Sequence, residues 1–136
     1  MTRLDNLKNK EYRDAFVESH IENGIAFQIK TMRESRNLTQ KQLGDLANMK
    51  PVDIYKLEDP NYGGYFTLKT LEKIAATFDV ALIVKFVPFS ELVQWDRDLS
   101  EKTLNVVSFD EELALAKITT RGGKNDKDQK KRNCGY

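Results

Sequence analysis

The stretch from Leu38 to Asp59, LTQKQLGDLANMKPVDIYKLED, carries start and stop signals for two short helices joined by a tight turn. Thr39 and Gln42 have the spacing of a capping box, in which each side chain bonds the backbone N–H of the other residue. Asn48 tolerates the left-handed backbone that a tight turn demands. We therefore expect a helix over about 39–47 that ends at this asparagine.

Pro51 suits the first position of the second helix, because the missing N–H costs nothing there and its φ is already helical. Pro60 forbids continuation, so this helix spans about 51–58. Met49 is expected to turn inward between the two helices. The expected buried positions of the pair are Leu43, Leu46, Ala47, Ile54 and Leu57.

Apolar periodicity predicts further helices on both sides of this pair. Upstream, Tyr12, Phe16 and Ile21 form one stripe. Gly24 costs about 1 kcal/mol in a helix interior, so the pattern predicts two helices, near 9–20 and 22–35. Downstream, Thr67 is expected to cap a helix with an apolar stripe. That stripe comprises Leu68, Leu71, Ile74, Ala75 and Phe78, and the loop aromatics Tyr62, Tyr65 and Phe66 are expected to pack against this helix rather than stack on bases.

Residues 81–87 (ALIVKFV) are β-branched and aromatic, which predicts a strand ending at Pro88. A lone strand leaves its backbone groups unsatisfied, so it needs a partner. One candidate partner is the same strand of a second subunit, antiparallel about a twofold axis; the other is residues 104–108 of the same chain. The expected dimerisation residues are Ala81, Leu82, Ile83, Val84 and Phe86.

The last third of the chain is divided by charge. Residues 88–116 carry two basic and seven acidic residues, and residues 117–136 carry seven basic and two acidic. Short helices are expected from Ser90 to Trp95 and from Phe109 to Ala116, with a disordered basic tail that is either a phosphate-binding arm or a solubilising end. Phe86, Phe89, Leu92 and Trp95 are expected to form one cluster. The resulting division is an N-terminal helical extension (1–21), a central domain (22–87), an acidic and aromatic extension (88–116) and the tail (117–136).

Several functional classes are poorly supported by the residues available. The single cysteine, Cys134, and the single histidine, His20, are too few for a Cys/His metal site. His20 is instead expected to be a partly exposed helix residue. We therefore expect no enzyme activity, no metal and no cofactor. No run approaches the roughly 18–20 apolar residues of a membrane span, and the N-terminus lacks the apolar centre of a signal peptide, so a cytoplasmic protein without a membrane partner is expected.

The joint pattern from 22 to 87 resembles the XRE family of Cro/repressor-like helix-turn-helix proteins. The residues that carry the resemblance are Thr39, Gln40, Leu43, Ala47, Met49, Ile54, Leu57 and Glu58, followed by the LEDPNYGG loop. The later part is similar to HigA-type antitoxins and small phage and bacterial regulators. The resemblance implies a mainly α, lambda-repressor-like bundle of four or five helices, followed by the strand, with the 51–58 helix in the major groove of double-stranded DNA.

The resemblance also implies a set of DNA-binding residues, with Gln40 at a position that commonly meets a phosphate. Because Ile54 and Leu57 face inward, the intervening side chains point elsewhere. The apolar Pro51 and Val52 suit thymine methyls, and Asp53 either accepts from cytosine or only favours the helix N-terminus. Each lysine is either a phosphate contact or a solvated surface residue. The full predicted set is Gln40, Lys41, Lys50, Pro51, Val52, Asp53, Tyr55, Lys56 and Lys69.

These features predict a sequence-specific transcriptional regulator, a homodimeric repressor on a palindromic operator. A narrower version is an antitoxin that represses its own operon and binds a toxin through either 88–116 or the N-terminal helix, and the acidic 88–116 suits a basic partner. The rival hypothesis is a protein-interaction adaptor that keeps the scaffold without reading bases. The formal net charge of +1 favours the adaptor, since DNA-binding domains are usually more basic.

Overall fold

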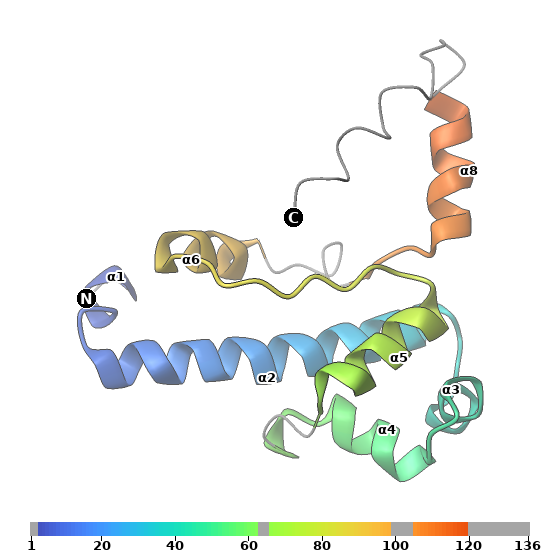
Figure 1. Cartoon of the computed structure of the whole chain (residues 1–136), viewed down its shortest axis with the longest axis horizontal. Helices are drawn as coiled ribbons and strands as arrows, with labels where there is room; N and C mark the ends of the chain where they lie inside the picture. The colour runs from blue at the N-terminus through green and yellow to red at the C-terminus, as the bar shows by residue number, and fades with distance from the viewer. Residues whose placement is uncertain (1–2, 63–65, 99–104, 120–136) are drawn as a thin grey trace.

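A computed structural model describes residues 3–62, 66–98 and 105–119 of the protein, and it is mainly helical, as expected (Figure 1). The element order is α1 (Arg3–Asn6), α2 (Lys10–Ser35), α3 (Gln40–Ala47), α4 (Pro51–Glu58), the 3-10 turn η1 (Pro60–Tyr62), α5 (Leu68–Phe78), α6 (Phe89–Arg97) and α8 (Phe109–Thr119). No helix within these ranges is long and apolar enough to cross a membrane.

The long helix α2 is continuous, so the prediction of two helices separated at Gly24 is wrong. Asn9 caps it by accepting from the backbone N–H of Tyr12 at 3.1 Å. A glycine costs only about 1 kcal/mol within a helix. That cost is small enough for tertiary packing to override, and α6 lies alongside α2 (Figure 1), with Asp96 3.8 Å from His20.

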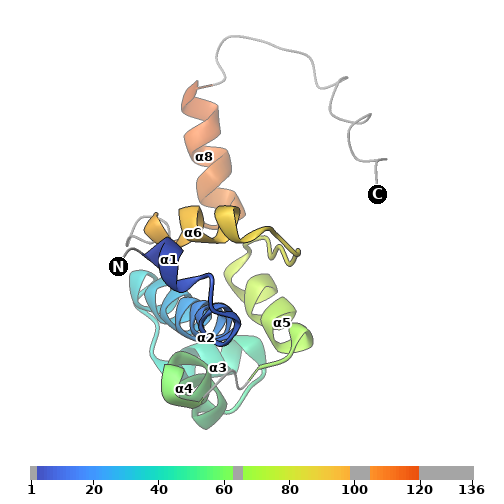
Figure 2. The ribbon, with the colours of Figure 1, turned by 90° about the vertical axis from the view of Figure 1, so that its left-hand side faces the viewer.

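The main core forms where α3, α4 and α5 pack around the C-terminal half of α2 (Figures 1 and 2). The nine buried members are Ile29, Met32, Leu43, Ala47, Ile54, Leu57, Leu71, Ile74 and Phe78. The predicted inward position of Met49 is confirmed, since it packs against this cluster. Phe66 packs there too, as expected of the loop that precedes α5.

Three residues expected on apolar stripes are exposed. Leu46 is 64% exposed, Leu68 55% and Ile21 45%. In α3 the buried stripe runs through Leu43, Gly44 and Ala47, which centres it one position away from Leu46. A short helix buries only one narrow stripe, and the close contact at Gly44 decides which stripe it is.

Residues 81–87 link α5 to α6, and they are not paired as a strand in the described part of the chain. The alternative internal partner, 104–108, is described from 105 onward, and that part anchors the base of α8 instead. The Val106 carbonyl accepts from Arg36 Nη2 at 2.9 Å, and the Phe109 N–H donates to the Asp79 carbonyl at 3.0 Å. The described residues therefore contain no internal hairpin.

The two helices predicted beyond residue 88 are both present, as α6 and α8. The end of α8 includes 117–119, which were expected to belong to the disordered tail; the remainder of the tail lies outside the described residues. Three of the four residues expected to cluster are exposed in the single chain, since Phe86 is fully exposed, Trp95 60% exposed and Phe89 37% exposed. Only Leu92 of that set is buried.

The two described glycines of the helices make a matched test of this packing. A Cβ at Gly44 would lie 2.6 Å from the Met49 carbonyl oxygen, whereas a Cβ at Gly24 would meet nothing within 4 Å. We expect Gly44→Ala to lower the free energy of unfolding by about 1–3 kcal/mol through overpacking. Gly24→Ala should raise it by about 0.5–1 kcal/mol, because alanine is the better helix former. Urea unfolding followed by circular dichroism measures both; equal effects would contradict the close approach at Gly44.

Candidate nucleic-acid interface

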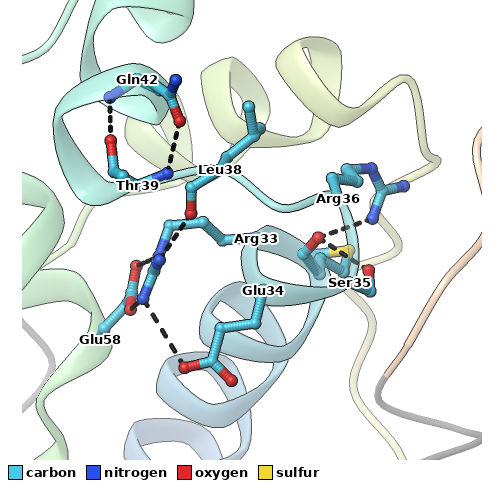
Figure 3. A network of polar contacts seen from close by, with 9 residues as sticks. Arg33, Glu34, Ser35, Arg36, Leu38, Thr39, Gln42 and Glu58 are labelled. Carbon is cyan, nitrogen blue, oxygen red and sulfur yellow. Dashed lines mark hydrogen bonds and ion pairs between the residues drawn. The ribbon is translucent and has the colours of Figure 1, made fainter.

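The first helix of the pair begins with the predicted capping box. The Thr39 N–H donates to Gln42 Oε1 at 2.8 Å, and the Gln42 N–H donates to Thr39 Oγ1 at 3.1 Å (Figure 3). Two backbone donors at the helix start are therefore satisfied by side chains. Because both bonds are local, the start of α3 is set by the sequence at 39–42 alone.

The turn between α3 and α4 is tight and has the expected left-handed residue. Asn48 adopts φ 53° and ψ 48°, a conformation that asparagine tolerates better than most residues. The Met49 N–H then donates to the Gly44 carbonyl at 2.7 Å. Together with the missing Cβ of Gly44, this bond brings the start of α4 directly against α3.

A buried ion pair that the sequence reasoning did not find holds the other end of α4. Arg33 Nε and Nη2 donate to Glu58 Oε2 and Oε1 at 2.7 and 2.9 Å (Figure 3). The side chains of Arg33 and Glu58 are only 12% and 4% exposed. Arg33 Nη1 also donates to the Leu38 carbonyl at 2.7 Å. One guanidinium therefore joins α2, the linker before α3 and the last residue of α4.

The charge pairing at this site is strong. The hydrogen bonds that Arg33 donates to the Glu58 carboxylate raise the pKa of Arg33 above its usual range, against the opposing effect of burial. A fork-like guanidinium matches a carboxylate through two parallel bonds, which adds geometric specificity to the attraction. The pair is 25 residues apart in sequence, so no local pattern indicates it.

With both ends held, α4 presents a face of mixed chemistry to solvent. Val52 is 50% exposed and Tyr55 48% exposed, and Pro51 is also exposed. Asp53 and Lys56 are half-buried at the sides of this face. The sequence-based prediction that Ile54 and Leu57 point inward is confirmed, since they are 0% and 3% exposed.

Tyr62 of η1 joins this face, which the sequence reasoning did not foresee. Its ring meets that of Tyr55 edge-on, with centroids 6.0 Å apart and planes at 76°. Lys56 Nζ lies 6.0 Å from the Tyr62 centroid, a distance at which a cation is attracted to the ring. The expectation that Tyr62 packs against the helix after the loop is therefore wrong; the fold of η1 returns it to α4. Tyr65 lies outside the described residues.

The other predicted contact residues lie on neighbouring elements. Lys50 is exposed at the start of α4, and Gln40 and Lys41 begin α3. Lys69, in the first turn of α5, is 92% exposed at its side chain and lies 3.8 Å from Glu72. α3 contacts both α4 and α5, so these residues belong to adjoining helices. We name the face formed by residues 50–53, 55, 56 and 62 the α4 face.

Comparisons with known proteins do not assign this chain to a family. No protein-family model matches the chain, and searches of curated proteins and of solved structures find no match. What the α4 face does is therefore inferred from its own residues.

The buried ion pair can be tested against an exposed neighbour. We expect Glu58→Ala to lower the free energy of unfolding by about 3 kcal/mol, because it removes both carboxylate hydrogen bonds from the largely buried guanidinium of Arg33. Thermal unfolding monitored by circular dichroism measures the change. Glu34→Ala is the control, since Glu34 lies 3.9 Å from the same Arg33 but its side chain is 58% exposed. That variant should change stability by less than about 0.5 kcal/mol, and equal losses would contradict the assigned role of Glu58.

Proposed function

We propose that this protein is a sequence-specific DNA-binding transcriptional regulator, a repressor that occupies its operator by inserting α4 into the major groove. The observation that supports this most directly is the α4 face itself: an exposed short helix held rigidly at both ends. A binding helix needs such support, because its side chains must be held in a defined geometry. The resemblance to the XRE family points the same way, and a regulator of this kind acts in the cytoplasm with its DNA.

The start of α4 has the chemistry for reading bases. The major groove is about 12 Å wide and admits an α-helix, and helices of this kind usually reach base edges with their first residues. Pro51 and Val52 occupy those positions and lack hydrogen-bonding side chains. Apolar contact with thymine methyl groups is the base contact that such residues make.

The remaining residues of the face supply polar and charged contacts. Lys50 and Lys56 flank the apolar patch, and either can meet phosphates. Tyr55 is held by its edge-on contact with Tyr62, so its hydroxyl reaches the DNA from a fixed ring at little entropic cost. Asp53 lies in the first turn of α4, where its charge favours the helix N-terminus.

A second candidate function is a protein-interaction adaptor, and two observations favour it. Residues 39–57 contain three lysines and two aspartates, so the region around the α4 face has little net charge for holding DNA. In addition, α8 exposes Phe109 and Leu113 beside the acidic residues of its first turn. A basic protein suits that surface, as it would in an antitoxin that also represses its own operon.

Selection from a random DNA library, followed by fluorescence anisotropy on the enriched sequences, tests the proposal. We expect Lys50→Ala to weaken binding to all sequences alike and to reduce the slope of log affinity against log salt by about 1. Val52→Ala should instead lower the preference for a thymine by about 1 kcal/mol and leave the salt slope unchanged.

Lys8→Ala is the control, since the side chain of Lys8 is 84% exposed between α1 and α2, far from the α4 face (Figure 1). It should leave affinity and salt slope unchanged. If no sequence is enriched and the wild-type chain binds no enriched DNA at low salt, the regulator proposal fails and the adaptor function remains.

A further inference from the structure

Residues 81–87 form a continuous run of exposed side chains, most of them apolar. Phe86 is fully exposed, Ile83 is 78% exposed and Val84 65%. We name this run the 81–87 segment. A contiguous exposed apolar patch of this kind indicates an interaction surface.

The backbone of the 81–87 segment is unpaired in the described part of the chain, whereas its one charged side chain, Lys85, lies 3.4 Å from Glu91. Within the described residues, no backbone hydrogen bond joins it to another segment. The segment is bounded by Asp79, which has a left-handed φ of 56°, and by Pro88, which has no N–H. A row of free donors and acceptors between two such boundaries is an open edge for strand pairing.

We propose that a second copy of this chain pairs antiparallel with the 81–87 segment about a twofold axis that passes through Val84. In an antiparallel ribbon, directly opposite side chains lie on the same face, so the two residue numbers differ by an even number. A twofold axis normal to the ribbon must therefore pass beside a residue that lies opposite its own copy. Centring on Val84 uses the full length between the two boundaries, with Leu82 opposite Phe86. Centring on Lys85 would place two lysines opposite each other, which is destabilising.

A ribbon of two short strands does not hold a dimer by itself. Isolated two-stranded ribbons are marginal in water, and stable interfaces bury about 800 Å² per partner. A second exposed element is available, since the described side chains of α8, 109–115, all face solvent. An isolated helix of this length is marginally stable in water, so packing against a second copy would stabilise α8.

The register places α8 against the second copy. The Phe109 N–H is bonded to the Asp79 carbonyl, so the base of α8 lies two residues before the start of the 81–87 segment. In the antiparallel register, residue 81 lies opposite residue 87 of the second copy. The apolar side of α8, with Phe109 and Leu113, therefore reaches the second copy near its Phe86 and Phe89, which are both exposed.

A second copy fits this surface better than a different partner does. Pairing about Val84 satisfies both chains with one surface, as an isologous interface must. The 81–87 segment, α6 and α8 lie on one side of α2, whereas α3 and α4 lie on the other (Figures 1 and 2). The pairing thus leaves the α4 face uncovered in both copies. The inference goes beyond the proposed function, because it holds whether or not the protein binds DNA.

The mass of the full-length chain in solution tests the proposal without DNA. Sedimentation equilibrium should give a dimer for the wild type. Val84→Asp should weaken dimerisation by at least about 100-fold, because it opposes two carboxylates at the axis. Leu46→Asp is the matched control: Leu46 is 64% exposed, like Val84, but lies on α3, and it should leave the dimer intact. A monomeric wild type, or equal effects of the two variants, would overturn the proposal.

Disulfide trapping tests the register. In a Cys134→Ser background, single cysteines are introduced from Leu82 to Phe86, and each variant is oxidised and separated on a non-reducing gel. Directly opposite residues in antiparallel strands have Cα atoms about 4.5–5.5 Å apart, within the range of a disulfide. Val84→Cys should therefore cross-link fastest. A maximum at any other position would overturn the assigned axis.

Leu113→Asp tests the contribution of α8. It should weaken the dimer by about tenfold or more, because it places a charge in an apolar contact, while circular dichroism confirms that the chain remains folded. If this variant dimerises with the affinity of the wild type, the placement of α8 against the second copy is wrong.

Discussion

The ion pair between Arg33 and Glu58 is the constraint on which the arrangement of the helices most depends. It joins the last turn of α2 to the last residue of α4, and its side chains are almost completely removed from solvent. A buried charge is costly unless its partner and hydrogen bonds are in place. Since the same guanidinium also holds the Leu38 carbonyl, any other placement of α4 leaves several strong polar groups unsatisfied. The pair therefore selects one position for α4 among those that its apolar residues would allow.

The opposite end of α4 is held by a different kind of contact. There the absence of a side chain at Gly44 allows the Met49 carbonyl to approach α3, and the left-handed Asn48 reverses the chain. The C-terminal end of α4 is thus positioned by an ion pair, and its N-terminal end by close packing against Gly44. Between them, the apolar Ile54 and Leu57 occupy the core and leave the opposite side of the helix to solvent. The α4 face is rigid because it has little freedom to rotate or slide.

The surfaces available for interaction lie on opposite sides of α2. The α4 face is compact and supported by the main core, whereas the 81–87 segment and α8 extend from the body with little internal support (Figure 2). All residues of the α4 face come from one chain, so this face suits a ligand that binds each copy separately. Exposed apolar side chains and an unpaired stretch of backbone suit assembly between copies, because association covers the side chains and supplies backbone hydrogen bonds. This division allows a dimer to form without covering the α4 face.

Local chemistry in the sequence determined the helix boundaries of the central pair: the Thr39 capping box, the Asn48 turn and Pro51 each act on residues within four positions. Most of the periodic core residues were also predictable, because burial of one helix face needs only a regular spacing; Leu46, Leu68 and Ile21 share that spacing and are exposed. Tertiary structure decided the rest. Gly24 is a local helix breaker that packing overrides, and Tyr62 lies on the α4 face because η1 returns the chain there. The bonds of Arg33 to Glu58 and of Arg36 to Val106 span 25 and 70 residues. Contacts of that range depend on how whole helices pack, which spacing along the chain does not specify.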